Sequence, residues 1–285
     1  MSMKHLRRLQ RMLAYCCGFS VLPVFLSCSL LIEKERQQCV TDKDCEAYGP
    51  EFAGGICLDT VCSPDPKWAC AENPEIPEPQ GAIDSTLTIM NVVDFQLVPD
   101  IHVRLCGTLD LSCRNPLGEG ISGPSGQVLF RVPEGFGGYL VLEGDAIEPV
   151  LYFPSLPIKE GEALGYAYVN PAGALEDLAT QLGDVVQPGR GLAVVQIFDC
   201  QQAPAVGVTV EFDGDLTGAL PYYALQGIPS PNATFVDDTG VAGLLNAPTG
   251  ALGVNVKLGT RTIGSFSMLI RDGYVSFAVL QLGKV

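Results

Sequence analysis

The cysteines are the residues with the clearest chemical role in this sequence, which holds 11 of them among 285 residues. Cys16 and Cys17 lie in an apolar stretch near the N-terminus, and Cys28 follows that stretch. The other eight are Cys39, Cys45, Cys57, Cys62, Cys70, Cys106, Cys113 and Cys200. This even number predicts disulfides formed in an oxidising compartment. A zinc site or a redox-active dithiol is disfavoured, because the eight contain no CxxC motif.

The disulfide connectivity stays open at this stage, because eight cysteines allow about a hundred full pairings. We expect the four cysteines between positions 39 and 62 to pair among themselves. Cys106 and Cys113 could then join within one hairpin, which leaves Cys70 to reach Cys200.

Pairs of carboxylates are the next candidates for chemistry, and they are Asp42 with Asp44, Asp213 with Asp215, and Asp237 with Asp238. Such pairs are usually turn residues that accept hydrogen bonds from their own backbone. A calcium site needs six or more oxygen ligands, and Asp213-Gly-Asp215 is too short for an EF-hand loop. We therefore expect turn chemistry, with calcium as the less favoured alternative and catalysis as the least favoured.

Other polar motifs point away from catalysis. His102, the only histidine after the N-terminal stretch, lies in an alternating run beside Val103 and is expected to be an ordinary strand residue. The glycines between Gly118 and Gly123 lack the lysine of a phosphate-binding loop and are read as a turn. The sequence thus predicts no catalytic residue, no metal site and no cofactor.

Three aromatic residues are candidates for contact with a ligand. Trp68 stands between Pro66 and Cys70, where we expect it to pack on a disulfide or on the first β-module. Tyr222 and Tyr223 are adjacent, so in a strand they face opposite sides and one of them could be exposed. They are the possible ligand contacts, with local packing as the alternative.

The N-terminus has the pattern of an export signal. Its basic start is followed by an uncharged run from Met12 to Ser27 and then by Cys28. This ending resembles a bacterial lipobox, and the resemblance implies cleavage before Cys28 and acylation of that residue. An uncleaved membrane helix from Met12 to Ile32 and simple secretion remain as alternatives. Each of the three exports the rest of the chain.

The charge of the chain excludes one class of partner. The net charge is −15, and the first 28 residues contribute four basic residues and no acid, so the remainder is still more acidic. An acidic surface repels phosphate backbones, so nucleic acid is not expected as a partner.

Composition divides the chain into successive segments. Five cysteines fall between positions 39 and 70, a stretch too poor in large apolar residues to form a core without disulfides. The predicted segments are a signal and anchor (1–28), a tether (29–38), a cysteine-rich head (39–70), a Pro-rich acidic linker (71–83) and two β-modules (84–186 and 187–285).

Short apolar runs separated by turn residues follow the linker. Their spacing of about ten residues is typical of sandwiches and barrels. One amphipathic segment interrupts them near 171–182, where Asn170 would cap a helix and Gly183 would end it. The predicted fold is mainly β: two antiparallel β-sandwich modules, preceded by a small disulfide-rich segment, with one short helix between the modules.

A faint internal repeat supports two modules. Pro99 to Leu105 matches Pro204 to Val210 at an offset of 105 residues. The turn glycines Gly126 and Gly240 recur at an offset of 114 residues, and one insertion near Leu216 to Pro231 would explain the difference. The order of strand, turn, strand and Pro-x-Gly resembles the carboxypeptidase regulatory-like, or transthyretin-like, β-sandwich family. The Cys39 to Cys70 segment is similar to the cysteine-rich heads of predicted myxobacterial lipoproteins. These resemblances imply a fold and supply no catalytic residues.

Taken together, these patterns favour a non-enzymatic envelope lipoprotein, and we expect it in the outer membrane, facing the periplasm or the cell surface. Its partners would be the membrane, through a lipid anchor, and an unidentified envelope protein or glycan. An accessory or regulatory subunit of a secreted hydrolase and a purely structural spacer are the alternatives.

Overall fold

The computed structural model describes residues 39–48, 52–72, 81–133, 135–154 and 164–283. They belong to two compact units, one ending at Asp65 and the other beginning at Pro66, and each is described by itself. Cys28, the tether and most of the linker lie outside the described residues. Within the described ranges, no helix is both long and apolar enough to cross a membrane.

The first unit is a small head built around two disulfides. Cys39 pairs with Cys57, and Cys45 pairs with Cys62. The sulfur-bearing side chains form most of its core, as expected for a segment with few large apolar residues. Its elements are α2 (Asp42–Cys45), η1 (Glu46–Tyr48) and the hairpin of β1 (Ile56–Leu58) and β2 (Val61–Ser63).

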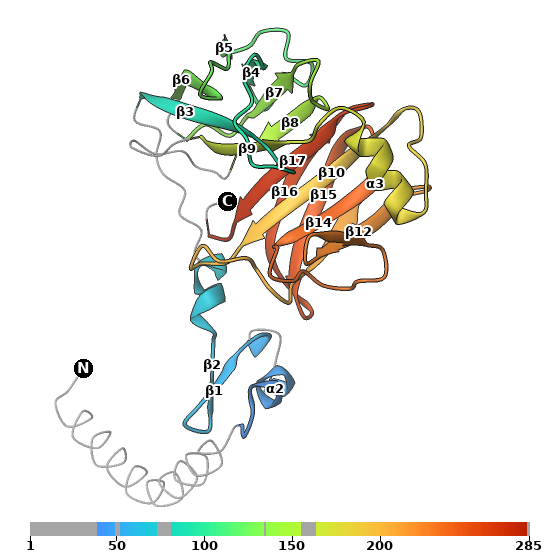
Figure 1. Ribbon diagram of the computed structural model, residues 1–285. Coiled ribbons are helices and arrows are strands. Elements are labelled where there is room, and N and C mark those ends of the chain that lie inside the picture. Colours follow the sequence, from blue (N-terminus) through green and yellow to red (C-terminus); the bar gives the residue numbers. More distant parts are fainter. Residues whose placement is uncertain (1–38, 49–51, 73–80, 134, 155–163, 284–285) are drawn as a thin grey trace, which may run out of the picture. The chain divides into compact units, whose positions relative to one another are not determined.

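The second unit contains one long sheet of nine strands (Figure 1), in the order β13-β12-β14-β10-β17-β8-β7-β4-β5. Their bounds are β4 (His102–Cys106), β5 (Gly118–Ile121), β7 (Tyr139–Glu143), β8 (Val150–Phe153), β10 (Arg190–Phe198), β12 (Leu220–Leu225), β13 (Ile228–Ser230), β14 (Val241–Pro248) and β17 (Val275–Gln281).

Two three-stranded sheets complete the unit. One has the order β6-β3-β9 and the other β11-β15-β16. The bounds are β3 (Ala82–Asn91), β6 (Gln127–Pro133), β9 (Gly165–Val169), β11 (Thr209–Asp213), β15 (Gly250–Leu258) and β16 (Arg261–Ile270). The chain is therefore mainly β, as the sequence predicts.

The two halves of this unit have the same strand pairing. In the first half, β3 pairs antiparallel with β6 and parallel with β9, while β7 pairs with β4 and β8. In the second half, β10 pairs antiparallel with β14 and parallel with β17, while β15 pairs with β11 and β16. Each half is thus a sandwich of the same topology.

Backbone hydrogen bonds at the repeated glycines agree with this correspondence. The Ile89 amide donates to the carbonyl of Gly126, and the Ile197 amide donates to that of Gly240, each at 2.8 Å. Both glycines have positive φ, and a Cβ on either would lie 2.8 Å from the same isoleucine carbonyl oxygen. Glycine is needed at both places because no other side chain fits so close to a backbone.

The two sandwiches are joined edge to edge. Strand β17 of the second half pairs in parallel with β8 of the first half, so that Val275 lies opposite Val150. A sheet of each half thereby becomes part of the nine-stranded sheet, and both halves fall in one compact unit. The expected antiparallel modules therefore also contain parallel pairs, within each half and at the junction.

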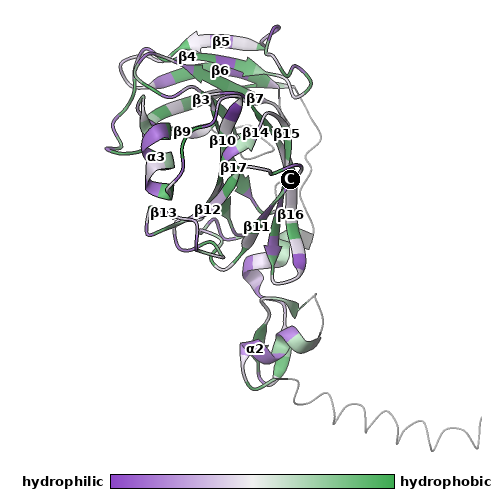
Figure 2. Cartoon of the chain, turned by 90° about the vertical axis from the view of Figure 1, so that its right-hand side faces the viewer, coloured by the Kyte–Doolittle hydropathy of each residue, from purple (hydrophilic) through white to green (hydrophobic). Residues whose placement is uncertain are grey.

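The two faces of the long sheet are covered by different elements. On one face, a core cluster joins the β6-β3-β9 sheet and α3 (Ala174–Leu182) to residues of β7, β8, β10 and β17. On the other face, a second cluster joins β10, β14 and β17 to the β11-β15-β16 sheet. Figure 2 shows the hydrophobic residues concentrated on these strands.

Three local expectations need correction. The helix begins at Ala174, three residues later than Pro171, because Pro171 pairs with Ile147 and Gly173 forms the N-cap. The glycine-rich stretch forms strand β5 instead of a turn; a Cβ on Gly120 would lie 2.8 Å from the side chain of Val128, so glycine permits a close approach.

Trp68 lies in η3 (Pro66–Glu72) and packs in the core of the second half, in the same cluster as the disulfide-bonded Cys70. Of its two expected positions, only packing on the first module is therefore wrong.

Candidate functional site

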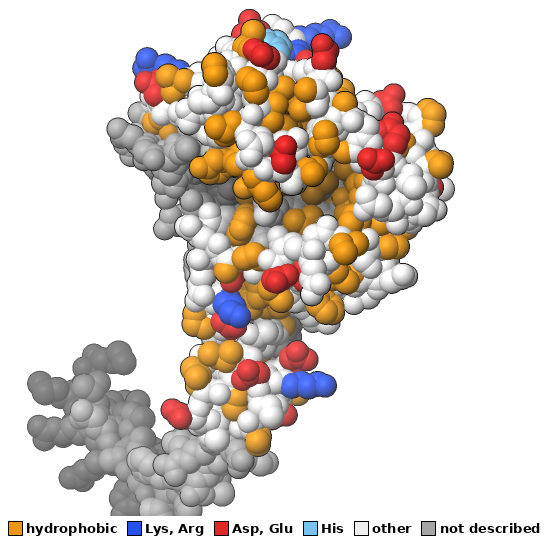
Figure 3. Space-filling model, in the orientation of Figure 1, with side chains coloured by type: hydrophobic (Ala, Val, Ile, Leu, Met, Phe, Trp, Pro, Cys, Tyr) orange, Lys and Arg blue, Asp and Glu red, His pale blue; other side chains and the backbone are white. Residues whose placement is uncertain are grey.

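A cavity of about 460 Å³ lies between α3 and one face of the long sheet. Strands β10, β12, β14 and β17 supply its floor, while α3, the β12–β13 hairpin and the segment after β3 supply its walls. Figure 3 shows hydrophobic side chains gathered around a hollow on this side of the unit. The lining residues are Val92, Val93, Tyr168, Asn170, Pro171, Ala174, Leu175, Asp177, Leu178, Gln181, Leu192, Val194, Tyr222, Ala224, Gly227, Pro229, Val241, Val275 and Phe277.

The cavity exists because this part of the sheet has a narrow cover. A helix is about 10 Å wide and neighbouring strands lie about 4.8 Å apart, so one helix covers about two strands. The first half has a three-stranded sheet over the same face, whereas the second half has α3 against the floor strands. A volume of this size falls in the range of small-molecule sites.

Both candidate contact tyrosines are buried, as the local-packing interpretation expects. They lie in β12 and face opposite sides of the sheet, as the alternation requires. Tyr222 is 5% exposed and lines the cavity, whereas Tyr223 is 9% exposed and belongs to the core on the other face. Both are buried because β12 pairs with β14 and so lies inside the sheet, not in an exposed loop.

The surroundings of the two tyrosine hydroxyls differ. The Tyr223 hydroxyl accepts a hydrogen bond from the Val210 amide at 3.0 Å. The ring of Tyr222 lies against Gly243, its cross-strand partner, where no side chain would fit. None of the described residues makes a hydrogen bond to the Tyr222 hydroxyl.

Burial gives four tyrosines a predicted response to alkali. Desolvation raises the pKa of Tyr222 and Tyr152 far above the usual value of 10.0, and it also raises the pKa of Tyr139 and Tyr274. A raised folded-state pKa contributes stability that is present below pH 10 and is lost as the pH rises through the folded value. Absorbance at 295 nm should therefore show part of the tyrosine signal appearing only above pH 10, with Tyr222 and Tyr152 ionising only as the chain unfolds. A single smooth titration of all nine tyrosines near pH 10, with the fold intact, would contradict this.

One cavity wall is held by Asp237. The β12–β13 hairpin turns at Gln226 and Gly227, which both have positive φ, as in a type I′ turn. The Asp237 carboxylate accepts hydrogen bonds from the Gln226 amide at 2.6 Å and from the amide and hydroxyl of Thr239 at 2.9 and 2.6 Å. Desolvation tends to raise the pKa of Asp237, but these hydrogen bonds outweigh it and lower the pKa.

Replacing this carboxylate should therefore have a pH-dependent effect. Asp237→Asn should lower the free energy of unfolding near pH 7 by about 1–2 kcal/mol, the range for partly exposed charge-assisted hydrogen bonds. A lowered folded-state pKa contributes stability above the unfolded value of about 3.9 that is lost as the pH falls through the folded value. Urea unfolding at pH 7 and near pH 2.5 should show the difference shrinking in acid, with the exposed Asp145→Asn as the control. An equal difference at both pH values would contradict this role.

The opposite wall, α3, is fixed at both ends. The Gly173 amide donates to the Glu148 carboxylate at 2.6 Å. After the helix, the buried Asn246 side chain accepts from the Gln187 amide at 2.9 Å and donates to the Val185 carbonyl at 2.9 Å. A charge at a helix N-terminus and a fully bonded buried amide are both stabilising arrangements. The helix is therefore tied to the sheet that it covers.

The predicted carboxylate pairs are held in turns and caps. Asp44 accepts from the amides of Val40 and Thr41, each at 2.8 Å, and these bonds lower its pKa. Asp215 accepts from the hydroxyl and amide of Thr217, which lowers its pKa as well. Asp42 and Asp44 accept from different partners, as do Asp213 and Asp215, whereas the side chain of Asp238 interacts with that of Asp237. His102 lies in β4, with Nε2 at 3.8 Å from the Glu119 carboxylate.

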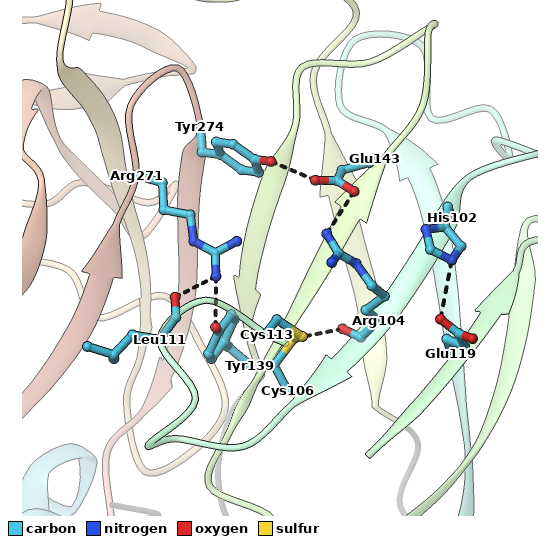
Figure 4. A network of polar contacts seen from close by, with 10 residues as sticks. All are labelled: His102, Arg104, Cys106, Leu111, Cys113, Glu119, Tyr139, Glu143, Arg271 and Tyr274. Atoms are coloured by element: carbon cyan, nitrogen blue, oxygen red, sulfur yellow. Dashed lines mark hydrogen bonds and ion pairs between the residues drawn. A yellow bond between two sulfur atoms is a disulfide. The ribbon is translucent and has the colours of Figure 1, made fainter. Parts of the chain in front are cut away.

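A polar network away from the cavity joins the two halves (Figure 4). Arg271 donates to the Leu111 carbonyl at 2.7 Å and to the Tyr139 hydroxyl at 2.9 Å. Tyr274 donates to the Glu143 carboxylate at 2.6 Å, and Arg104 pairs with the same carboxylate at 2.9 Å. Arg271 and Tyr274 come from the second half and the others from the first, so the network supports the junction between the halves.

The cysteines described in the structure are all paired. Cys106 pairs with Cys113 and Cys70 with Cys200, in agreement with the pairing inferred from sequence. The sulfurs of Cys39, Cys45 and Cys62 lie within 4.8 Å of one another, but each belongs to a disulfide of the head and cannot serve as a thiolate ligand.

The cavity was missed by sequence reasoning apart from Tyr222. Its floor residues are ordinary apolar strand positions such as Leu192, Val194 and Phe277. Their alternation identifies a buried face, but it does not show where the cover of that face is incomplete. Gly243, within an apolar run, was the one available signal.

Comparison with known proteins assigns neither a family nor a function. No protein-family model matches the chain, and no curated protein matches it. Among solved structures, the chain is similar to the Bacillus anthracis TIE protein, with 13% identity over 71% of this chain and a TM-score of 0.25. That alignment covers 34% of the TIE protein.

Two pilins are similar at the same level. They are a double mutant of the shaft pilin SpaA from Lactobacillus rhamnosus GG, with 10% identity, and the minor pilin of Streptococcus agalactiae, with 14% identity. Each alignment covers 70% of this chain, with 98% and 96% of the pilin and TM-scores of 0.25 and 0.24.

Proposed function

We propose that this chain is a non-enzymatic envelope protein, exported and anchored through an acylated Cys28, whose double sandwich contacts another envelope component. Support for export comes from the four disulfides of the described residues, which form in oxidising compartments. We further propose that the two halves are related carboxypeptidase regulatory-like modules, and their shared strand pairing supports this relationship.

The observation that carries the contact role is an exposed apolar rim at the cavity. Val93 is 71% exposed and Val92 40%, and both line the cavity in the segment after β3. Phe95, which is 61% exposed, follows them and packs edge-on against the lining residue Tyr168. Exposed hydrophobic residues gathered around a hollow are typical of interaction sites, and loops on a rigid β-scaffold often carry them. We propose a protein partner, because apolar rim residues pack against a protein surface but offer no hydrogen-bond partner to the hydroxyls of a sugar.

The contact role is tested by recovery of a partner from cross-linked envelopes. Wild-type chain should recover a repeatable partner, and Val93→Asp should abolish the recovery by placing a charge on the rim. The matched control is Leu129→Asp, because Leu129 is 68% exposed but lies on β6, and this variant should recover the partner normally. Recovery of no repeatable partner by wild type, or unchanged recovery by Val93→Asp, would count against the proposal.

The anchor has its own test, since Cys28 lies outside the described residues. Mass spectrometry of the mature N-terminus should show a chain that begins at Cys28 and carries lipid. A chain with its leader intact, or one without lipid, would replace the acyl anchor with a membrane helix or with secretion.

A further inference from the structure

The interior of the cavity has a different character from its rim. The floor consists of apolar side chains on one face of the sheet, including Leu192, Val194, Val275 and Phe277. Water in such a space makes few hydrogen bonds, so an apolar group that displaces it gains free energy. The floor therefore favours an aliphatic or aromatic occupant.

Tyr222 is the polar group at the floor. It is 95% buried, since 5% of the residue is exposed, and its hydroxyl has no hydrogen-bond partner among the described residues. The hydroxyl oxygen is not among the fully buried atoms without a partner, so it can be reached through the cavity that Tyr222 lines. A phenolic hydroxyl can donate one hydrogen bond and accept others, so a ligand in the cavity can bond to it. The ring itself is held in place by the cross-strand contact with Gly243.

The charge around the cavity limits the ligand further. Asp177 is the one lining residue that is charged at neutral pH, and Glu176 precedes it in the first turn of α3. The lining contains no lysine or arginine, and the whole chain has a net charge of −15. An anion would meet repulsion at the opening and no counter-charge inside.

A sugar fits the interior poorly. Each buried hydroxyl of a sugar needs a hydrogen-bond partner, whereas the floor offers one phenolic group among aliphatic and aromatic side chains. The polar side chains Asn170, Asp177 and Gln181 come from the α3 side and not from the floor.

We propose that this cavity binds a small uncharged amphipathic molecule, with its apolar body on the floor of the sheet and its polar end hydrogen-bonded to the Tyr222 hydroxyl. This inference goes beyond the proposed contact function and does not depend on it. A partner protein on the rim and a small molecule in the cavity are detected by separate measurements.

The test uses two fluorescent probes that share one aromatic body. N-phenyl-1-naphthylamine is neutral and carries an amine, while 8-anilinonaphthalene-1-sulfonate adds a negative charge to the same rings. Each is titrated into the purified full chain, and any binding to the leader cancels when variants are compared. The neutral probe should bind wild type saturably and at least tenfold more tightly than the sulfonate.

Two pairs of variants localise the binding. Ala174→Phe fills the cavity from α3 and should abolish saturable binding, whereas Ala172→Phe is its control on an exposed position outside the lining. Tyr222→Phe removes the unpartnered hydroxyl and should weaken binding about two- to tenfold, the usual worth of one hydrogen bond. Tyr223→Phe removes a hydroxyl on the opposite face and should leave affinity within about twofold.

Each binding result supports or overturns a specific part of the proposal. Loss of binding in Ala174→Phe and weakening in Tyr222→Phe, with both controls unaffected, supports the proposal. Equal binding by Ala174→Phe and wild type overturns the site, and equal affinity of Tyr222→Phe and wild type overturns the role of the hydroxyl. Tighter binding of the sulfonate overturns the ligand class. Circular dichroism of each variant shows whether it has folded, and for a misfolded Ala174→Phe the smaller Ala174→Leu takes its place with the same expected loss.

Discussion

Removing the Cys70–Cys200 disulfide should lower the free energy of unfolding of the second unit by about 5 kcal/mol, the largest effect that we expect from any substitution. The two cysteines are 130 residues apart, and the chain between them contains the whole first sandwich. In the chain-entropy description, a cross-link stabilises by restricting the unfolded chain, and the effect grows with the length of the closed loop. The double variant Cys70→Ala with Cys200→Ala avoids leaving a free thiol.

The same disulfide also fixes the segment that contains Lys67 and Trp68 against the core of the second half. Trp68 is 6% exposed in the core of the second half, and the Cys200 amide donates to the Lys67 carbonyl at 3.0 Å. Trp68 is the only tryptophan of the chain, so its fluorescence reports on this segment directly. Urea unfolding followed by that fluorescence measures the predicted loss.

The chain offers a matched control for this prediction. Cys106 and Cys113 are 7 residues apart, and their removal should lower the free energy of unfolding by about 2.4 kcal/mol on the same description. Two equal losses, or a larger loss for the short loop, would show that loop length does not determine the effect.

Replacing Arg271 by methionine should destabilise the second unit by about 2–4 kcal/mol. Arg271 makes two hydrogen bonds to the first half, to the Leu111 carbonyl and the Tyr139 hydroxyl. Its guanidinium also lies 5.6 Å from the ring centre of Tyr139 and 5.7 Å from that of Tyr274. Methionine keeps much of the apolar stem but loses every one of these interactions.

Two further variants sharpen this measurement. Arg271→Lys keeps the positive charge but loses the planar guanidinium. Its free energy of unfolding should therefore lie between those of wild type and Arg271→Met. Arg131→Met, on the exposed side of β6, should change the free energy of unfolding by less than about 0.5 kcal/mol. The free energies are measured by urea unfolding. If Arg271→Met lowered the free energy of unfolding no more than Arg131→Met does, the network would have no stabilising role.

Both predictions concern connections that join distant parts of the chain. The sequence shows the residue types at positions 70 and 271, but it does not print the partner of either side chain. Cysteine counting left the connectivity open, but the pairing of Cys70 with Cys200 that we expected among the alternatives agrees with the structure. The partners of Arg271 could not be found in this way, because a hydrogen bond to a backbone carbonyl 160 residues away leaves no pattern in either segment.

Several features of the two halves could be predicted from local sequence patterns. The glycines at positions 126 and 240 were visible as repeated turn residues, and the structure gives both the same hydrogen bond to a strand. Helix α3 was expected from its apolar spacing, and Gly183 ends it as expected. Its start was misplaced, because the bridge between Pro171 and Ile147 holds the preceding residues in an extended form.

The amino-acid sequence by itself indicated the mainly β class, the disulfide-stabilised head, the repeated pattern of the two halves and the turn roles of the carboxylates. Periodicity, cysteine count and turn chemistry are local properties, so they can be read without knowing the partners of a strand. Tertiary structure alone decided that β8 and β17 pair, that Tyr222 faces a cavity and that Arg271 joins the halves. Edge pairing is made by backbone groups that every residue carries, and a cavity depends on the width of the layer that covers a sheet.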